Sequence, residues 1–149
     1  MDTDTRTTAL AADPLRSRLL AVLNEEQARS GQVSKEFIER TAAVFDLTIG
    51  DVYGVATFYH MLSTKPLGRH VIRVCKSLPC HLKNSAEVID AVQAELGIQP
   101  GETTADGRFS LVLTNCIGAC DHAPAMLLDQ EIIGDLTPEK IKRVLQSCE

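Results

Sequence analysis

Residues 70–80 have the sequence His70-Val71-Ile72-Arg73-Val74-Cys75-Lys76-Ser77-Leu78-Pro79-Cys80. The first five are mostly apolar and β-branched, which is typical of a buried strand. One cysteine follows the strand directly, and a second comes after four intervening residues. This stretch therefore predicts a strand whose carboxyl end carries a pair of cysteines, Cys75 and Cys80.

A second cysteine pair follows a second strand pattern. Residues 109–113 alternate as a strand would, and they lead to Cys116 and, after three further residues, to Cys120. If the two strands are neighbours in one parallel or mixed sheet, their loops leave the sheet at the same edge. Four thiolates would then surround one small space.

The rest of this region predicts a small sheet with helices. Residues 85–96 place apolar side chains at helical spacing and are followed by Gly97, a typical helix cap. Residues 125–128 and 131–133 predict two more strands joined by a turn, and a last helix begins at Thr137. The order β-α-β-β-β-α fits a small sheet covered by helices.

The clearest internal break is Lys65-Pro66-Leu67-Gly68, because proline and glycine both interrupt helices. Three helices are expected before it: one from Pro14 to just before Gly31, one capped by Ser34, and one from Thr48 to Met61.

The chain is therefore expected to divide into three parts. Residues 1–12 lack apolar periodicity and predict a loose leader. A helical domain is expected at residues 13–65 and a domain with a sheet at 69–149. The predicted fold class is α+β.

Composition limits the function. The chain has 149 residues, 44% of them hydrophobic, and a net charge of −5 without a dense basic stripe, which argues against nucleic acid as a partner. It has no apolar run of the length that a membrane span needs and no secretion signal, so we expect a cytoplasmic protein without direct membrane insertion. It also lacks the glycine-rich motifs of nucleotide sites. In a reducing compartment, its five cysteines are expected to be metal ligands or redox groups.

The four paired cysteines suit a [2Fe–2S] cluster, which takes four thiolates and then carries net negative charge. Gly118, between Cys116 and Cys120, can adopt a positive φ that turns backbone N–H groups toward sulfur. A zinc site is the main rival, although the usual C-x₂-C pairs are absent. A thiol oxidoreductase using Cys75 and Cys80 as a dithiol is a further alternative, although the chain has no C-x-x-C motif. Spacing alone leaves all three open.

Three other residues have simpler interpretations. Cys148 stands alone near the C-terminus and is expected not to be a ligand. His81 and His122 are expected to be loop residues near the site rather than ligands. If histidines bound the metal, a complete set of four cysteines would stay unused.

Several segments in register resemble the thioredoxin-like [2Fe–2S] ferredoxin subunit family. They are residues 68–75 with Cys80, residues 101–109, Cys116-Ile117-Gly118-Ala119-Cys120 with Ala123-Pro124, and Gly54-Val55-Ala56-Thr57-Phe58-Tyr59 in the helical part. Many relatives carry glycine where this chain has Asn84, but asparagine tolerates the left-handed backbone region, so the loop should survive.

The resemblance implies three N-terminal helices followed by a thioredoxin-like domain with a four-stranded mixed sheet. It implies one [2Fe–2S] cluster with Cys75, Cys80, Cys116 and Cys120 as both the metal-binding and the cofactor-binding residues. It also implies an electron-transfer subunit, without bond chemistry of its own, that docks on a flavoprotein carrying FMN and NAD(H). The implied hosts are a soluble NAD-dependent formate dehydrogenase, with its molybdenum or tungsten and iron–sulfur subunits, NADH:quinone oxidoreductase, or an NAD(P)-linked hydrogenase.

Overall fold

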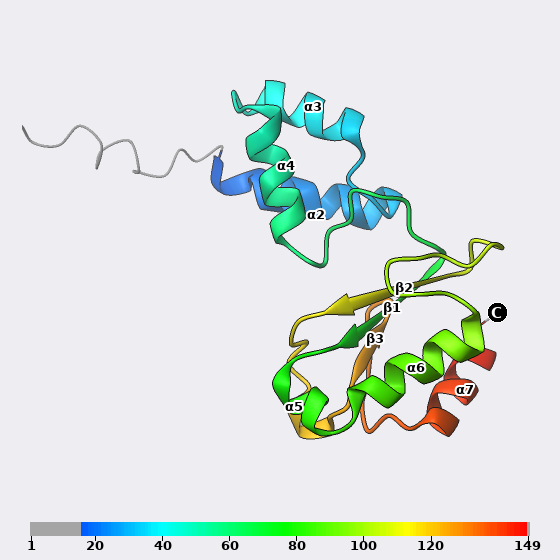
Figure 1. Ribbon diagram of the computed structural model, residues 1–149. Coiled ribbons are helices and arrows are strands. Elements are labelled where there is room, and N and C mark those ends of the chain that lie inside the picture. The colour runs from blue at the N-terminus through cyan, green and yellow to red at the C-terminus, as the bar shows by residue number, and fades with distance from the viewer. Residues whose placement is uncertain (1–15, 149) are drawn as a thin grey trace, which may run out of the picture. The chain divides into compact units, whose positions relative to one another are not determined.

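The computed structural model describes residues 16–148, which form two compact units that divide between Pro66 and Leu67 (Figure 1). This division falls within the break predicted from proline and glycine. The predicted leader at 1–12 and the predicted helix start at Pro14 lie outside the described residues. Among residues 16–148, every helix is too short or too polar to cross a lipid bilayer.

The first unit contains three α-helices, as predicted. After a 3₁₀ turn at Arg16–Arg18 come α2 (Leu19–Ser30), α3 (Lys35–Val44) and α4 (Ile49–Phe58). The Ser34 side chain accepts a hydrogen bond from the Phe37 N–H and so caps α3. Because Tyr59 has an extended backbone, α4 ends at Phe58 rather than at the predicted Met61.

Apolar side chains from all three helices form the core of this unit. They are Leu19, Leu23, Val33, Ile38, Ala42, Phe45, Val52, Ala56 and Leu62.

The second unit is built on a four-stranded mixed sheet, again as predicted. Its elements are β1 (His70–Cys75), α5 (Leu78–Leu82), α6 (Ser85–Leu96), β2 (Phe109–Thr114), a 3₁₀ turn at Cys120–His122, β3 (Met126–Leu128), β4 (Glu131–Ile133) and α7 (Pro138–Gln146). The strand order is β2-β1-β3-β4. β1 and β2 run parallel, whereas the β1–β3 and β3–β4 pairs are antiparallel.

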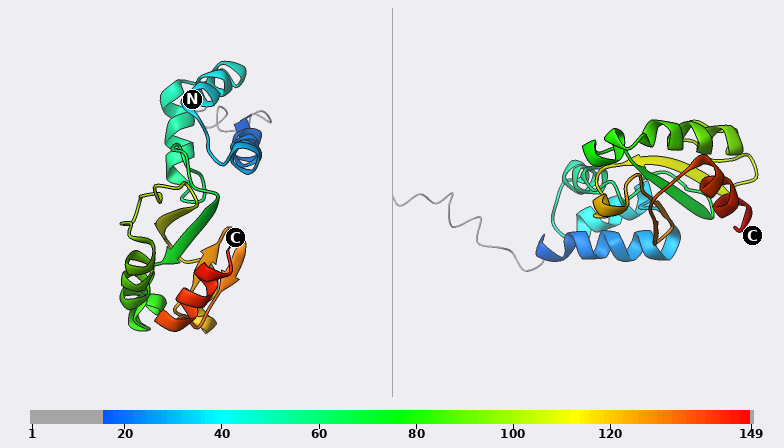
Figure 2. Two further views of the ribbon diagram at one scale, coloured as in Figure 1. Left: turned by 90° about the vertical axis from the view of Figure 1, so that its right-hand side faces the viewer. Right: turned by 90° about the horizontal axis from the view of Figure 1, so that it is seen from below.

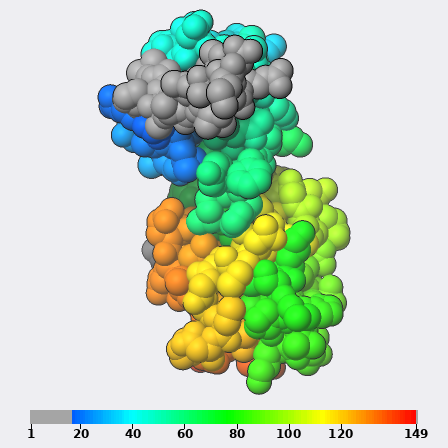
Figure 3. Space-filling view, turned by 90° about the vertical axis from the view of Figure 1, so that its left-hand side faces the viewer, coloured from blue at the N-terminus to red at the C-terminus, as the bar shows by residue number. Residues whose placement is uncertain are grey.

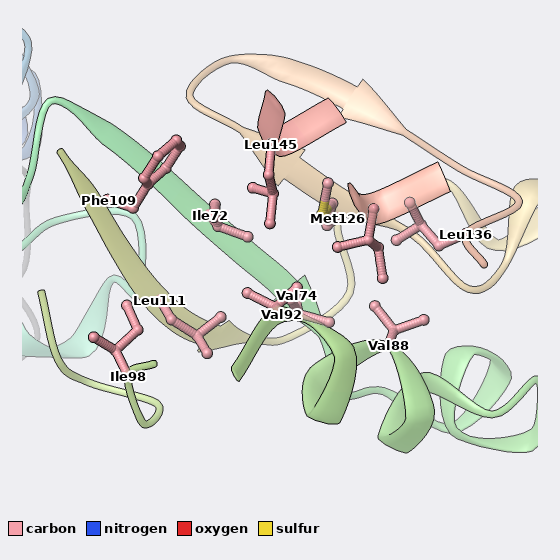
Figure 4. Close-up of a cluster of buried hydrophobic side chains, with 11 residues drawn as sticks. Ile72, Val74, Val88, Val92, Ile98, Phe109, Leu111, Met126, Leu136 and Leu145 are labelled. Atoms are coloured by element: carbon pink, nitrogen blue, oxygen red, sulfur yellow. The ribbon is translucent and has the colours of Figure 1, made fainter. Parts of the chain in front are cut away.

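Helices α6 and α7 pack against each other and supply side chains to one core on the sheet (Figures 2 and 4). Ile72 and Val74 of β1 and Leu111 of β2 point into this core (Figure 4). Because side chains alternate along a strand, Arg73 and Cys75 point to the opposite face. The last residue of β1 is therefore directed away from the main core.

Candidate metal centre

All four paired cysteines belong to segments at the carboxyl ends of β1 and β2. Cys75 is the last residue of β1 and lies opposite Thr114, the last residue of β2. Cys80 lies in α5, which directly follows β1. Cys116 lies in the loop after β2, and Cys120 begins the next 3₁₀ turn. Because the two strands are parallel neighbours, both loops leave the same edge of the sheet. The segments around residues 78–82 (green) and 115–120 (yellow) lie side by side on the surface in Figure 3.

Cys116 and Cys120 form an exposed outer pair, with their Sγ atoms 3.4 Å apart. Two thiolates bound to one tetrahedral metal with bonds of about 2.3 Å would lie about 3.8 Å apart, so this pair needs little movement to hold one metal ion. Gly118 has φ +86°, as its predicted role requires, and its N–H donates to Cys116 Sγ at 3.4 Å. That hydrogen bond is the largest cause that lowers the pKa of Cys116, which favours the thiolate that binds metals.

Cys75 and Cys80 form a buried inner pair, with 1% and 2% of their surfaces exposed. They pack with Ala119, which belongs to the loop of the outer pair, and with Ala125. Burial is the largest cause that raises the pKa of Cys80, and the backbone N–H of Ala125 opposes it by bonding the sulfur. The Cys75 N–H in turn donates to the Ala125 carbonyl oxygen at 3.1 Å. The inner pair is thus buried against Ala119 of the outer loop and against Ala125.

The two pairs act on each other electrostatically. Cys116 is the largest cause that raises the pKa of Cys120, and the inner Cys75 raises it further. Cys120 likewise adds to the elevated pKa of Cys80. Each thiolate makes it harder for a neighbouring thiol to lose its proton. A bound metal cation offsets this repulsion and allows all four thiols to be deprotonated.

The four cysteines lie as two pairs, Cys75 with Cys80 and Cys116 with Cys120. Across residues 16–148, no three or more cysteine, histidine or acidic side chains converge closely enough to hold a single ion. A structural zinc ion needs four donors around one point, whereas a [2Fe–2S] cluster has two irons and four thiolate ligands, so each iron can take one pair. Two separate but adjacent cysteine pairs fit that cluster.

Comparison with known proteins agrees with this chemistry. The sequence matches the thioredoxin-like [2Fe–2S] ferredoxin family over residues 8–149. The chain belongs to this family. Membership in the thioredoxin-like [2Fe–2S] ferredoxin family implies a [2Fe–2S] cluster.

Two curated relatives are subunits of a larger enzyme, NADH-quinone oxidoreductase. The relative from Pseudomonas aeruginosa is 39% identical over 135 residues, which cover 91% of this chain and 81% of the relative. The same subunit of the Escherichia coli strain K12 enzyme is 41% identical over 134 residues, which cover 90% of this chain and 80% of the relative.

A solved structure is similar in fold to most of this chain. The crystal structure of an NAD⁺-reducing [NiFe]-hydrogenase in the air-oxidized state matches with a TM-score of 0.73 and 30% identity over 88% of this chain. The match covers 22% of the hydrogenase chain, so this protein corresponds to about a fifth of it.

Asn84 is predicted from the sequence to tolerate a left-handed backbone. It has φ +64°, in the left-handed region, and it immediately precedes α6. The loop therefore keeps the backbone conformation that glycine would allow, as expected from the sequence.

Gly134 supports the outer cysteine loop, although no local sequence pattern indicates this role. A β-carbon at this position would overlap the His122 side chain and come within 2.7 Å of the His122 carbonyl oxygen. That carbonyl accepts a hydrogen bond from the Asp135 N–H at 2.6 Å. Gly134 thus lets the chain after β4 pass close to the turn that begins at Cys120.

The prediction that His81 and His122 are loop residues was wrong, because His81 lies in α5 and His122 ends the 3₁₀ turn at Cys120–His122. His122 and Cys148 make the following contacts. His122 Nδ1 lies 2.9 Å from Asp135 Oδ2, and its Nε2 lies 3.4 Å from Asp121 Oδ2. The Cys148 thiol donates to the Val144 carbonyl oxygen at 3.3 Å and packs against the core under α7 rather than with the four paired cysteines.

Proposed function

We propose that this chain holds one [2Fe–2S] cluster on Cys75, Cys80, Cys116 and Cys120, and exchanges single electrons with the FMN of a flavoprotein subunit that binds NADH. The observation that carries the proposal is the placement of two cysteine pairs beyond parallel neighbouring strands, with Cys116 and Cys120 already at metal-pair spacing. When bound, such a cluster accepts and releases one electron at a time, whereas NADH delivers two electrons to a flavin as hydride.

The two cysteine pairs differ in burial, so one side of the site faces the protein interior and the other faces the surface. The inner cysteines are shielded from water, while Cys116 and Cys120 are exposed. Electron exchange with another subunit requires one side of the cluster to approach the surface, and the outer pair provides it. The N–H groups of Gly118 and Ala125 donate to sulfur and so offset the negative charge of the site.

Exposed apolar side chains beside the site fit a docking surface. Leu78 and Leu82 lie one helical turn apart on α5, on either side of Cys80, and are 67% and 72% exposed. Large apolar side chains grouped at a functional edge favour a protein partner. We propose that this surface meets the flavoprotein.

The helical unit has apolar surface of its own. Val44, Ile49, Tyr53 and Phe58 are each more than half exposed. A hollow of about 560 Å³ lies between α2 and α4 and is lined partly by Leu19, Leu20 and Phe58. Such a surface suits a subunit that is covered in an assembled complex.

The relatives favour an NADH:quinone oxidoreductase or an NAD⁺-reducing hydrogenase as the host complex. A soluble NAD-dependent formate dehydrogenase, with molybdenum or tungsten and further iron–sulfur subunits, remains part of the proposal on resemblance alone. In each host, this chain has a cytoplasmic location and no catalytic residue.

Co-purification with the flavoprotein subunit tests the proposal. Adding NADH to the anaerobic complex should bleach the visible absorbance of the cluster in this chain. Leu78→Glu with Leu82→Glu should abolish co-purification while the isolated chain keeps its cluster. Ile132→Glu is the matched control, because Ile132 is an exposed apolar residue on β4, at the opposite edge of the sheet from β2. A chain that binds the flavoprotein but is never reduced by NADH contradicts the proposal.

The two alternatives predict different results. A zinc-stabilised assembly module would contain zinc and no acid-labile sulfide. A thiol oxidoreductase using Cys75 and Cys80 would keep its activity in Cys116→Ser. The burial of both thiols and the raised pKa of Cys80 disfavour a reactive dithiol, because the nucleophile in disulfide exchange is an accessible thiolate.

A further inference from the structure

Within residues 16–148, three buried side-chain polar atoms have no hydrogen-bond partner: His70 Nε2, Arg73 Nε and Thr114 Oγ1. Buried hydroxyl groups in native proteins are nearly always paired, so an unpaired one calls for a specific explanation. Thr114 is 1% exposed and ends β2 immediately before the loop that carries Cys116 and Cys120.

Thr114 lies directly beside a proposed cluster ligand. It is the register partner of Cys75, and the Lys76 N–H donates to the Thr114 carbonyl oxygen at 3.0 Å. Register partners on neighbouring strands point to the same face of a sheet, and strands lie about 4.8 Å apart. Since Val74 and Leu113 contribute to the core under α6 and α7, Thr114 and Cys75 both point to the other face. The Thr114 hydroxyl and the Cys75 thiol are therefore carried on adjacent strands and on the same face of the sheet.

The other two unpaired atoms are placed differently. His70 lies at the far end of β1, where its Nδ1 contacts Asp129 Oδ2 at 2.9 Å. Arg73 shares the face of Cys75 but lies two residues before it on the same strand. Of the three residues, only Thr114 is the register partner of a cysteine of the site.

We propose that the Thr114 hydroxyl donates a hydrogen bond to the Cys75 thiolate in the cluster-loaded protein, and so raises the reduction potential of the cluster. This inference rests on the proposed cluster site. Hydrogen bonds to cluster sulfurs are among the factors that set the potential of these centres. Reduction adds a negative charge that spreads onto the sulfurs, so a donor stabilises the reduced form more than the oxidised form. Thr114 is thus a residue that tunes the potential without binding iron.

Three variants of the full chain, reconstituted anaerobically with iron and sulfide, test the proposal by redox titration with EPR detection. Thr114→Val keeps the shape and removes the hydroxyl, Thr114→Ala removes it without overpacking, and Thr114→Ser keeps it. In the Val and Ala variants the midpoint potential should fall. At the wild-type midpoint potential, these variants should hold about tenfold more oxidised than reduced cluster, which corresponds to a fall of about 59 mV for one electron. The Ser variant should titrate as the wild type does.

Resonance Raman spectra supply a readout independent of electron transfer. The iron–thiolate stretching bands should shift on transfer to D₂O in the wild type and in the Ser variant, and part of that shift should vanish in the Val and Ala variants. If neither donor-free variant retains a cluster while the Ser variant does, the hydroxyl is needed to assemble the site, and its role in setting the potential is overturned.

The outcomes separate this inference from the proposed function. A wild-type chain that takes up no [2Fe–2S] cluster refutes the proposed function itself. A wild-type chain that titrates normally beside Val and Ala variants with unchanged midpoint potentials refutes only the role of Thr114. The role is also refuted if the Ser variant shifts as far as the Ala variant, because the effect would then follow side-chain volume.

Discussion

At the residue scale, Cys116 and Cys148 offer a matched pair of substitutions. Cys116→Ser removes one of the four proposed ligands, so we expect iron retained after desalting to fall about tenfold or more, since even indirect changes at metal sites cost about 10–100-fold in affinity. Cys148→Ser should retain iron as the wild type does, because that thiol donates to the Val144 carbonyl oxygen and packs under α7. Iron analysis of both proteins checks the expectation, and equal losses would contradict it.

Gly134→Ala should damage the outer cysteine loop without touching a ligand. The new β-carbon would overlap His122, two residues after Cys120. We expect a loss of about 1–3 kcal/mol in the free energy of unfolding, as for other overpacked sites, together with faster release of iron.

Gly54→Ala is the control for that change. Gly54 lies inside α4, and a β-carbon there would meet no atom within 4 Å beyond the neighbouring residues and backbone of its own helix. Alanine favours helices by about 1 kcal/mol over glycine, so this variant should be more stable than the wild type and retain its iron. Urea unfolding and iron release measure both variants, and a Gly134→Ala protein as stable as the wild type would contradict the packing argument.

The roles of residues that belong to a local sequence pattern could be predicted. The roles of residues that depend on tertiary contacts could not. The positive φ of Gly118 and the left-handed Asn84 follow from the residue types and the loops that hold them. Gly134 and Thr114 matter only because β4 leads back past His122 and because β2 pairs with β1, and neither contact has a local signal in the chain.

At the element scale, the start of α4 depends on a capping box. Thr48 Oγ1 accepts from the Asp51 N–H at 3.1 Å, and Asp51 accepts from the Thr48 N–H at 3.2 Å. Thr48→Ala should cost about 1 kcal/mol of unfolding free energy. Thr57→Ala, at an exposed position in the last turn of the same helix, should be neutral or stabilising because alanine has the higher helix propensity. Urea unfolding distinguishes them, and a similar effect of both changes would argue against the cap.

Glu26 should make the stability of the helical unit depend on pH. Its buried carboxylate accepts hydrogen bonds from Arg29 in α2, which is the largest cause that lowers the pKa of Glu26. A lowered pKa in the folded state contributes stability above the ordinary carboxyl value of about 4.3, and this contribution is lost as the pH falls through the folded value.

Thermal unfolding of Glu26→Gln between pH 7 and pH 3 measures this contribution. The variant should be less stable than the wild type near pH 7, and the difference should shrink as the pH falls below about 4. Glu25→Gln, at the exposed neighbouring position, is the control. A Glu26 difference that stays constant with pH would show that packing, rather than charge, is responsible.

Long elements with clear periodicity were predictable, and short ones were not. The helices at 85–96 and after Thr137 and the strands beginning at His70 and Phe109 were recognisable from spacing and caps. Helix α5 was missed because its five residues are too few to show a helical period, so a loop was expected after β1. That missed helix is the one that holds Cys80.

At the scale of the whole molecule, the sequence pattern indicated a division near residue 66 and the family resemblance implied a mixed sheet, but neither gave the strand order. Proline and glycine mark the division locally. The order β2-β1-β3-β4 depends on which strands pair, and apolar patterns alone do not encode that choice. The parallel pairing of β1 with β2 is nevertheless the feature that places the two cysteine loops at one edge.

Metal and sulfide analysis of the anaerobically reconstituted chain is the most direct test of the central claim, that these two loops together hold a two-iron cluster. We predict two irons and two acid-labile sulfides per chain, with an EPR signal of a single unpaired electron after one-electron reduction. One zinc ion per chain, with no labile sulfide and no such signal, would contradict the account.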